Sequence, residues 1–348
     1  MGKTSIEWTD ETLNPIRARH TETGKLGWHC TKPSAGCKNC YAEAMNKWRG
    51  TGLPFVPASK DKIEIFLDRT VLEKPLKWKK RKKIFMCDMT DLFHEDVSDE
   101  DINKVFEMMA NAQWFHGHQF QVLTKRPERM KRIVEEIGAG IAEQKKGKDN
   151  GDGTRSYSLH FHFPLNNIWL GVSVEDQKTA DERIPLLLQT PAAVRWISAE
   201  PMLGPVDLRL WLNVIPRMRT PVSSDSGLPC GETTLDWMPS YNINTGEIVK
   251  PLLDWVVVGG ESGPGARPCD IHWVRLIIEQ CKAAGVPVFV KQLGARPVHS
   301  LPKNAAGWTT FPALNFKDKK GGAMEEWPED LRARSSPNLS REWIPRDV

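Results

Sequence analysis

The 348-residue chain lacks any run of about 20 apolar residues, the length that a membrane-spanning helix needs. Its first ten residues, Met1 to Asp10, also lack the apolar stretch of a secretion signal. Both absences argue against a membrane-anchored or exported protein. We therefore expect a cytoplasmic location and no membrane partner.

Cysteine is scarce, with seven residues, and an odd number does not suit a framework of disulfides. In a reducing compartment, a close group of cysteines is typical of a metal site or a catalytic site. Cys30, Cys37 and Cys40 form such a group, and no fourth cysteine lies near them. Closed structural metal sites usually have four protein ligands. A [4Fe–4S] cluster held by three thiolates instead leaves one iron free to bind a small molecule.

The chain also lacks a strong charge of either sign, since its formal net charge is only +4. With 40% hydrophobic and 26% charged residues it has the composition of an ordinary globular protein rather than a disordered one. Its basic residues nevertheless gather in Lys77–Lys83, where six positive charges surround Trp78. Such a run can contact phosphates while its indole stacks on a base, or it can be a solvated helix end. Nucleic acid is therefore a candidate partner.

Short apolar strands alternate with amphipathic helices, and this alternation predicts an α/β fold with a parallel sheet of βα units. The predicted strands are β-branched or aromatic runs at Ser5–Thr9, Ile84–Cys87, Phe120–Leu123, Ile168–Val174, Val194–Ser198, Trp255–Val258 and Val288–Lys291. The predicted helices are Tyr41–Arg49, Asp99–Gln113, Pro127–Ile137, Gln177–Gln189 and His272–Ala284. Seven strands favour a (β/α) barrel, partial or nearly closed, although an open doubly wound sheet is also compatible with the pattern.

The expected domain organisation is a barrel over residues 1–295 followed by an irregular extension, residues 296–348, packed on it. Two segments interrupt the alternation and are predicted to be insertions, at about residues 138–167 and 210–250. The first is polar and rich in glycine, and the second contains several prolines and serines.

Polar side chains follow nearly every predicted strand, where active sites of parallel βα folds lie. Burying so many charges without partners would cost several kcal/mol each, so a functional rim is favoured over a purely structural barrel. Lys125 and Arg126 could bind a phosphate or carboxylate, or could pair with Glu175 or Glu200. The glycines before Glu261 would let the backbone approach a ligand closely, with Glu261 accepting a hydrogen bond from an amine or a ribose hydroxyl.

These motifs as a set resemble the phage-borne three-cysteine-motif family over most of residues 5–295. The likeness rests on Asn14-Pro15, on Gly-Cys-Lys-Asn-Cys-Tyr-Ala at residues 36–42, and on strand ends reading Asp-Leu-Phe-His, Leu-Thr-Lys-Arg-Pro, Ser-Val-Glu, Ala-Glu-Pro and Gly-Gly-Glu-Ser-Gly. The family in turn resembles radical S-adenosylmethionine enzymes, and its Cys-Tyr-Ala signature is similar to that of the spore photoproduct lyase branch.

The resemblance implies that Cys30, Cys37 and Cys40 hold a [4Fe–4S] cluster whose open iron is chelated by the methionine part of S-adenosylmethionine. Reductive cleavage would then give a 5′-deoxyadenosyl radical that abstracts hydrogen from the substrate, with the cofactor carrying the chemistry. A nucleic acid base or a nucleotide is the expected substrate. A reductant such as flavodoxin or ferredoxin is expected, and a separate partner protein is possible.

On this interpretation the rim residues divide into three roles. Lys125 and Glu200 are the candidate catalytic residues. The candidate cofactor-binding residues are Tyr41, Asp88, Asp91, Glu175, Gly259, Gly260 and Glu261, and the candidate substrate-binding residues are Arg126, Arg267, Lys291 and Gln292.

The chain departs from the radical-enzyme pattern in three ways. Six residues rather than three separate Cys30 from Cys37, and Tyr41 follows the third cysteine where an aromatic residue usually precedes it. The Gly-Gly-Glu that holds the methionine amine usually follows the second strand, whereas Gly-Gly-Glu at residues 259–261 follows the sixth. Asp88 or Asp91, after the second strand, is therefore the better-placed residue for the amine.

Two other classes of function fit the same residues. In one, the three cysteines and His29 or another ligand close a zinc site, and the barrel binds nucleic acid through Lys77–Lys83. In the other, the chain is a partner or scaffold protein of a phage–host conflict system, and its cluster only senses redox state. Iron content, followed by cofactor cleavage under reduction, separates the three classes.

Overall fold

A computed structural model describes residues 4, 6–145, 148–149, 155–156, 163–219, 234–242, 245–303, 307–310 and 314–337. The chain divides into two compact units, Met1–Glu200 with Asn338–Val348, and Pro201–Pro337. Within the described ranges, no helix is long and apolar enough to cross a membrane.

The first unit is built on five parallel strands that lie in chain order. They are β1 (Glu11–Leu13), β5 (Lys83–Met86), β6 (Gln119–Thr124), β9 (Ile168–Ser173) and β10 (Val194–Ala199). Every side chain of β9 is buried, as expected for a strand covered on both faces. The order never reverses, whereas a doubly wound sheet reverses at a switch point. The predicted α/β class is therefore confirmed, and the strand order is that of a (β/α) barrel.

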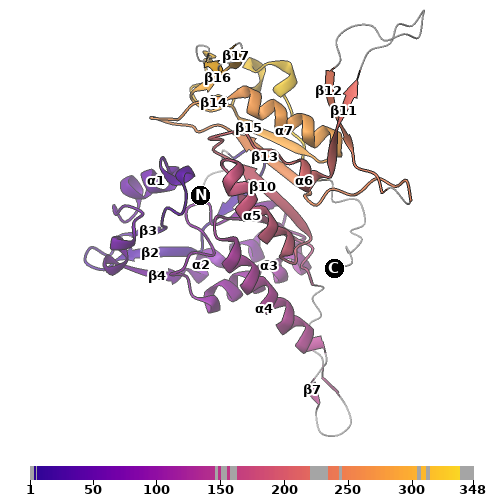
Figure 1. Ribbon diagram of the computed structural model, residues 1–348. Coiled ribbons are helices and arrows are strands. Elements are labelled where there is room, and N and C mark those ends of the chain that lie inside the picture. The colour runs from indigo at the N-terminus through magenta and orange to yellow at the C-terminus, as the bar shows by residue number, and fades with distance from the viewer. Residues whose placement is uncertain are drawn as a thin grey trace, which may run out of the picture. The chain divides into compact units, whose positions relative to one another are not determined.

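Helices connect these strands: α3 (Asp99–His116), α4 (Pro127–Lys145) and α5 (Gln177–Gln189). Ser98 caps α3 by accepting a hydrogen bond from the backbone N–H of Asp101. Asp176 and Thr179 form a capping box at the start of α5. Helices α4 and α5 pack side by side, which is the arrangement that successive right-handed βα units produce (Figure 1).

A small antiparallel sheet lies between β1 and β5 in the sequence, and the sequence patterns above do not predict it. Its order is β3-β2-β4, from β2 (Ile16–His20), β3 (Leu26–Gly27) and β4 (Ile63–Leu67). The three cysteines and helix α1 (Tyr41–Arg49) lie between β3 and β4. The short helix α2 (Arg69–Leu72) then leads back toward β5. The cysteines thus belong to an excursion that leaves the parallel sheet after β1 and returns at β5.

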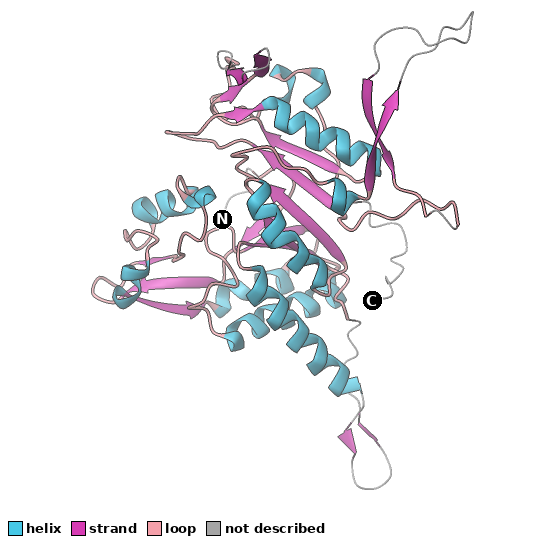
Figure 2. Ribbon diagram, in the orientation of Figure 1, coloured by secondary structure: helices cyan, strands magenta, loops and turns pink. Residues whose placement is uncertain are grey.

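The second unit contains two parallel strands, β13 (Trp255–Gly259) and β15 (Val288–Gln292), joined by α7 (Ile271–Ala284). An antiparallel pair, β11 (Val214–Arg219) and β12 (Thr234–Pro239), follows the short helix α6 (Arg209–Leu212). Short strands pair as β14 (Cys269–Asp270) with β16 (Pro297–Val298), and as β17 (Ser300–Lys303) with β18 (Gly307–Thr310) (Figure 2). Residues 333–335 pack on β15, where the Arg334 side chain donates to the Val290 carbonyl.

Two predicted boundaries were wrong. The first strand is Glu11–Leu13 rather than Ser5–Thr9, because residues 6–9 form a turn in which Trp8 is buried. Helix α4 continues past Ile137 to Lys145, through the predicted start of the first insertion. The described remainder of that insertion includes two short strands, β7 (Lys148–Asp149) and β8 (Arg155–Ser156). Residues 146–147, 150–154 and 157–162 lie outside the described part of the chain.

Candidate metal and cofactor site

The three cysteines lie in one loop that precedes α1. Cys37 ends a short 3-10 helix, Ala35–Cys37, and Cys40 is the residue before the first turn of α1. All three are free thiols and partly exposed. Cys30 and Cys40 pack with Trp28 against a small buried cluster of Ala42, Phe55 and Met89. The loop therefore presents three thiols on an apolar support.

The thiols must lose their protons before they can bind a metal. Burial raises the pKa of Cys30 to about 12, and burial also raises the pKa of Cys40. Because thiolates are the metal-binding form, binding must displace these protons and will be favoured at higher pH.

Arg126 joins this loop to the end of β6. Its guanidinium donates to Thr31 Oγ1 (2.7 Å), to Asp91 Oδ2 (3.0 Å) and to Glu95 Oε2 (2.8 Å). One of its terminal nitrogens lies 4.0 Å from Cys30 Sγ. Arg126 thus holds the segment after Cys30 and places a positive charge beside a candidate thiolate ligand.

Asp91 is largely committed to holding this arrangement. Its carboxylate accepts hydrogen bonds from Thr124 Oγ1 (2.7 Å) and from the backbone N–H groups of Phe93 and Lys125 (both 3.0 Å), besides Arg126. The side chain is buried. Four donors satisfy most of what one carboxylate can accept, so Asp91 organises the loop between β5 and α3.

Asp88 is more accessible and also lies beside the cysteine loop. Asn14 Nδ2 donates to its Oδ1 at 2.6 Å, and the half-exposed Tyr41 donates its hydroxyl to the Asp88 backbone carbonyl at 2.5 Å. Burial raises the pKa of Asp88, while the donors around it oppose the rise. Cys87, just before it, has a φ of 57°, a left-handed conformation that is uncommon outside glycine. Residues 14, 41 and 88, far apart in the sequence, therefore meet at one point.

Glu175, after β9, is buried at 1% exposure and anchors the cysteine loop from another side. It forms ion pairs with Lys125 and with Arg183, and the hydroxyl of Ser34 donates to its Oε1 at 2.9 Å. Burial alone would raise the pKa of Glu175, but Lys125 and Arg183 hold it below its ordinary value. Of the two alternatives for Lys125, the structure shows the ion pair with Glu175.

The carboxylate of Glu175 also fills the space in front of Gly36. A Cβ atom at Gly36 would lie 2.5 Å from Glu175 Oε1 and Cγ, closer than real Cβ contacts. We expect Gly36→Ala to lower the free energy of unfolding by about 1–3 kcal/mol, because the paired Glu175 has little freedom to move. Gly140→Ala in α4, where a Cβ meets nothing within 4 Å, is the control and should be neutral or slightly stabilising. Urea unfolding measures both, and an equal result for the two variants would contradict the close packing.

One known protein family matches this chain over most of its length. The model of a family described as "Protein of unknown function (DUF5131)" matches residues 3–323. The chain belongs to the DUF5131 family. A comparison with curated proteins finds no match, and a comparison with solved structures finds none either. The DUF5131 match spans the cysteine loop and the strand ends of both units.

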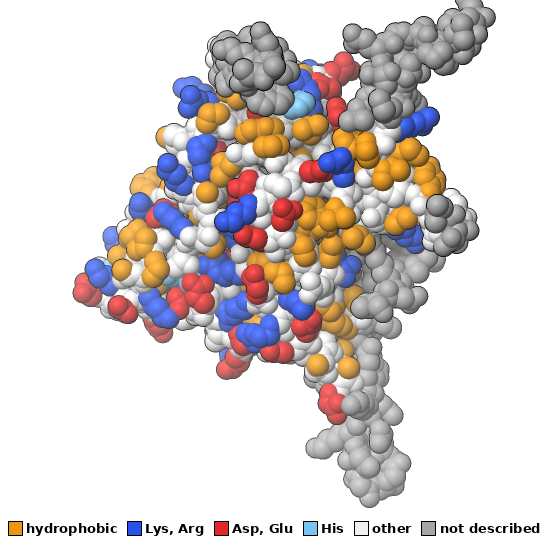
Figure 3. Space-filling model, in the orientation of Figure 1, with side chains coloured by type: hydrophobic (Ala, Val, Ile, Leu, Met, Phe, Trp, Pro, Cys, Tyr) orange, Lys and Arg blue, Asp and Glu red, His pale blue; other side chains and the backbone are white. Residues whose placement is uncertain are grey.

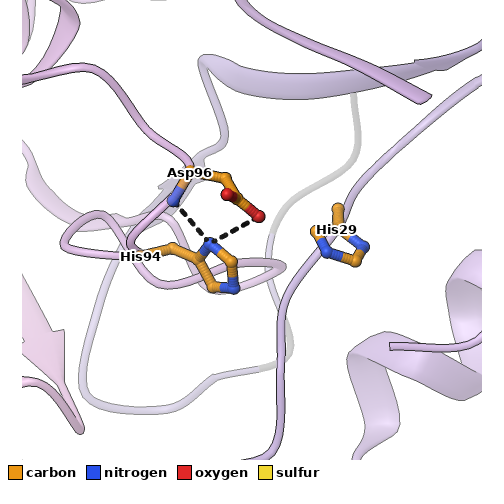
Figure 4. Close-up of side chains that lie close together, drawn as sticks. All are labelled: His29, His94 and Asp96. Atoms are coloured by element: carbon orange, nitrogen blue, oxygen red, sulfur yellow. Dashed lines mark hydrogen bonds and ion pairs between the residues drawn. The ribbon is translucent and has the colours of Figure 1, made fainter. Parts of the chain in front are cut away.

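Two histidines and an aspartate meet beside the cysteine loop of this DUF5131 chain, and the sequence analysis missed this group (Figure 4). His29 precedes Cys30, while His94 and Asp96 follow β5. Burial lowers the pKa of His29, and burial lowers that of His94 to about 4, so both rings are neutral near pH 7. The sequence offered two separate signals, His29 as a candidate zinc ligand and the Asp-Leu-Phe-His motif at residues 91–94, but their pairing depends on tertiary contact.

The predicted residues of the second unit form their own network. Arg267 makes two hydrogen bonds through its guanidinium to Glu261, at 2.7 and 3.0 Å, and donates its backbone N–H as well. Gln292 donates to the Gly260 carbonyl at 3.0 Å. A Cβ at Gly260 would lie 2.3 Å from the Leu293 carbonyl oxygen, so glycine permits a close backbone approach there. Gly259 ends β13 and Lys291 lies in β15, whereas Glu200, just after β10, belongs to the first unit. The catalytic, cofactor-binding and substrate-binding roles predicted for these residues remain predictions.

The basic run lies at the opposite edge of the first unit's sheet from the cysteine loop, because it enters β5 at its amino end. Lys77, Lys79, Lys80 and Arg81 are exposed. The Trp78 ring is already covered by Lys82, whose ammonium lies 4.6 Å from its centre. On the face drawn in Figure 3, side chains of both charges are interspersed. The run remains a candidate phosphate contact, but one remote from the thiols.

Proposed function

We propose that this DUF5131 chain is a radical S-adenosylmethionine enzyme that acts on a nucleic acid base or a nucleotide. One observation carries the proposal: three free thiols share a loop that is tied to the residues following β5, β6 and β9. In parallel βα folds these strand ends are where ligands bind and react. A loop of purely structural thiols would not need to be held there.

The donor set fits a [4Fe–4S] cluster with one open iron. Three thiolates would bind three irons, and Arg126 beside Cys30 would stabilise the negative charge of the assembly. When bound, the cluster would pass one electron from a reductant such as flavodoxin or ferredoxin to S-adenosylmethionine, which gives methionine and a 5′-deoxyadenosyl radical that takes hydrogen from the substrate.

The chain's own residues would hold and orient these groups. Arg126 and Asp91 fix the segment after Cys30, while Lys125, Glu175 and Ser34 fix the segment before Cys37. Asp88 is the best candidate to accept the methionine amine, because it is partly exposed whereas Asp91 is buried and saturated with donors. Tyr41 would keep the backbone of Asp88 in position. A second protein could deliver the substrate.

The test is anaerobic purification with iron and sulfide analysis, followed by dithionite and S-adenosylmethionine with an assay for 5′-deoxyadenosine. We expect about four irons per chain and formation of 5′-deoxyadenosine. Cys37→Ala should lose both, while Cys281→Ala, a buried thiol in α7, should retain them. Stoichiometric zinc without iron in the wild type would overturn the proposal.

A further inference from the structure

A second cluster of metal-ligating side chains adjoins the cysteine loop without including any cysteine. One ligand atom from each of His29, His94 and Asp96 lies within 4.8 Å of the others. The rings of His29 and His94 have centres 5.4 Å apart and meet edge to face. Figure 4 shows His94 and Asp96 on one loop and His29 on a separate segment across from the Asp96 carboxylate. The three side chains come from the two segments that also hold Cys30 and Asp91.

His29 supplies an independent sign that a ligand belongs here. His29 is only 5% exposed, and its Nε2 atom is buried without a hydrogen-bond partner among the residues that the structure describes. A buried polar atom without a hydrogen-bond partner is costly, and native structures rarely contain one. A metal ion bound at this ring would remove that cost.

The surroundings of His94 match those of a metal ligand. Its Nδ1 atom lies 3.8 Å from Asp96 Oδ2. Its Nε2 atom lies 3.0 Å from Thr31 Oγ1 and 3.4 Å from Glu95 Oε1. Histidines that bind a metal through one nitrogen usually donate the other N–H to a carboxylate or similar acceptor, which fixes the ring. Glu95 and Thr31 are in place to accept that proton while Nδ1 faces the cluster.

Two interactions of His94 and Asp96 would have to break before a metal ion could bind. His94 Nδ1 accepts a hydrogen bond from the Asp96 backbone N–H at 3.1 Å, and the Lys60 ammonium pairs with Asp96 Oδ1. Lys60 is 61% exposed, so solvent screens its ion pair with Asp96 and the pair is weak. An ammonium beside Asp96 already marks the position as favourable for a cation. A metal ion that lies about 2.1 Å from each ligand atom requires the three ligand atoms to move closer together by roughly 1 Å. Rotation of the side chains allows this movement.

We infer that His29, His94 and Asp96 bind a divalent transition-metal ion through two imidazole nitrogens and one carboxylate oxygen. This donor set suits Zn²⁺ or Fe²⁺ and leaves coordination positions open for water. The ion would join the segment before Cys30 to the loop after β5. The site is independent of the proposed cluster, since it uses none of its three thiols.

The experiment uses the full chain with Cys30, Cys37 and Cys40 all replaced by alanine, so that the proposed cluster cannot contribute. Titration with Co²⁺ should give one equivalent bound with visible d–d absorption and no thiolate charge-transfer band, and Zn²⁺ should displace it. Asp96→Asn should weaken Co²⁺ binding by more than about 100-fold, because even partners of metal ligands are worth 10–100-fold. Asp101→Asn in the first turn of α3 is the matched control and should bind as before.

Lys60→Ala tests the site in the other direction, because removing the competing ammonium should tighten Co²⁺ binding several-fold. If the triple alanine variant does not fold, the same titrations are made on the wild-type chain, where thiolate binding is recognised by its charge-transfer band. Absence of saturable binding free of thiolate bands, or equal affinity in Asp96→Asn and Asp101→Asn, would overturn the inference.

Discussion

Replacing Glu175 with alanine should lower the free energy of unfolding by about 3–5 kcal/mol, because it leaves the buried Arg183 and the partly buried Lys125 without their anionic partner. Lys125 and Arg183 both pair with Glu175, and their side chains are 19% and 7% exposed. The variant also removes the acceptor for Ser34 and the group that fills the space beside Gly36. The loss should therefore extend to the order of the cysteine loop.

Urea unfolding measures this loss, and hydrogen exchange over residues 31–40 reports the loop. Glu136→Ala is the matched control, since Glu136 also pairs with an arginine but is 58% exposed, and it should cost at most about 1 kcal/mol. Replacing Lys125 with methionine in the Glu175→Ala background should recover part of the stability, because one stranded charge is then absent. A Glu175→Ala variant as stable as Glu136→Ala would show that the buried pairs contribute nothing.

The same pairs make stability depend on pH. Lys125 and Arg183 lower the folded-state pKa of Glu175 against the effect of burial, so the folded chain releases this proton more readily than the unfolded chain. The stabilisation is therefore complete above the unfolded pKa, about 4.3, and is lost as the pH falls through the lower folded pKa. The stability difference between wild type and Glu175→Gln should shrink below pH 4.

Arg126→Met should lower the free energy of unfolding by about 3 kcal/mol and should release the segment after Cys30. The side chain is 12% exposed and contacts Thr31, Asp91 and Glu95 together. Asp91 keeps three other hydrogen-bond donors in this variant. The loss of unfolding free energy should therefore lie at the lower end of the range for a broken buried ion pair. Arg126→Lys should not restore the wild-type value, because an ammonium cannot reproduce the planar fork.

Chemical unfolding and hydrogen exchange at residues 28–34 test this expectation. Arg132→Met is the control, because Arg132 in α4 pairs with Asp99 and Glu136 at 47% exposure, and solvent screening should make its contribution to stability small. Faster exchange confined to the segment after Cys30 in Arg126→Met alone would support its role as a tether. Equal exchange in both variants would contradict it.

The parallel strands were predictable because their side chains are apolar on both faces, a pattern that local sequence carries. Six of the seven predicted strands overlap strands in the structure, and the five predicted helices overlap α1, α3, α4, α5 and α7. The strand β1 was misplaced because only three residues pair with β5. The small sheet was missed although Ile16, Ala18 and their neighbours alternate, because Arg17 and Arg19 made the segment look like a loop.

The candidate site was only partly readable. Spacing identified the three cysteines, and strand ends identified Asp88, Asp91, Lys125, Arg126 and Glu175, all of which the structure places around the cysteine loop. Local sequence could not show that Asp91 would be used up by four donors, nor that Lys125 would pair with Glu175 rather than a ligand. The sequence also did not predict the group of His29, His94 and Asp96, because His29 lies far from the other two residues until the chain folds.

The excursion that carries the cysteines also bears on how the chain folds. Strands β1 and β5 are neighbours in the sheet, yet everything from Asn14 to Lys82 lies between them. Closing so long a loop carries an entropic cost before the strands can pair, and such distant contacts slow folding. A metal ion that joins His29 to His94 and Asp96 would shorten the effective loop. Metal loading at this place would therefore raise the folding rate of the first unit as well as its stability.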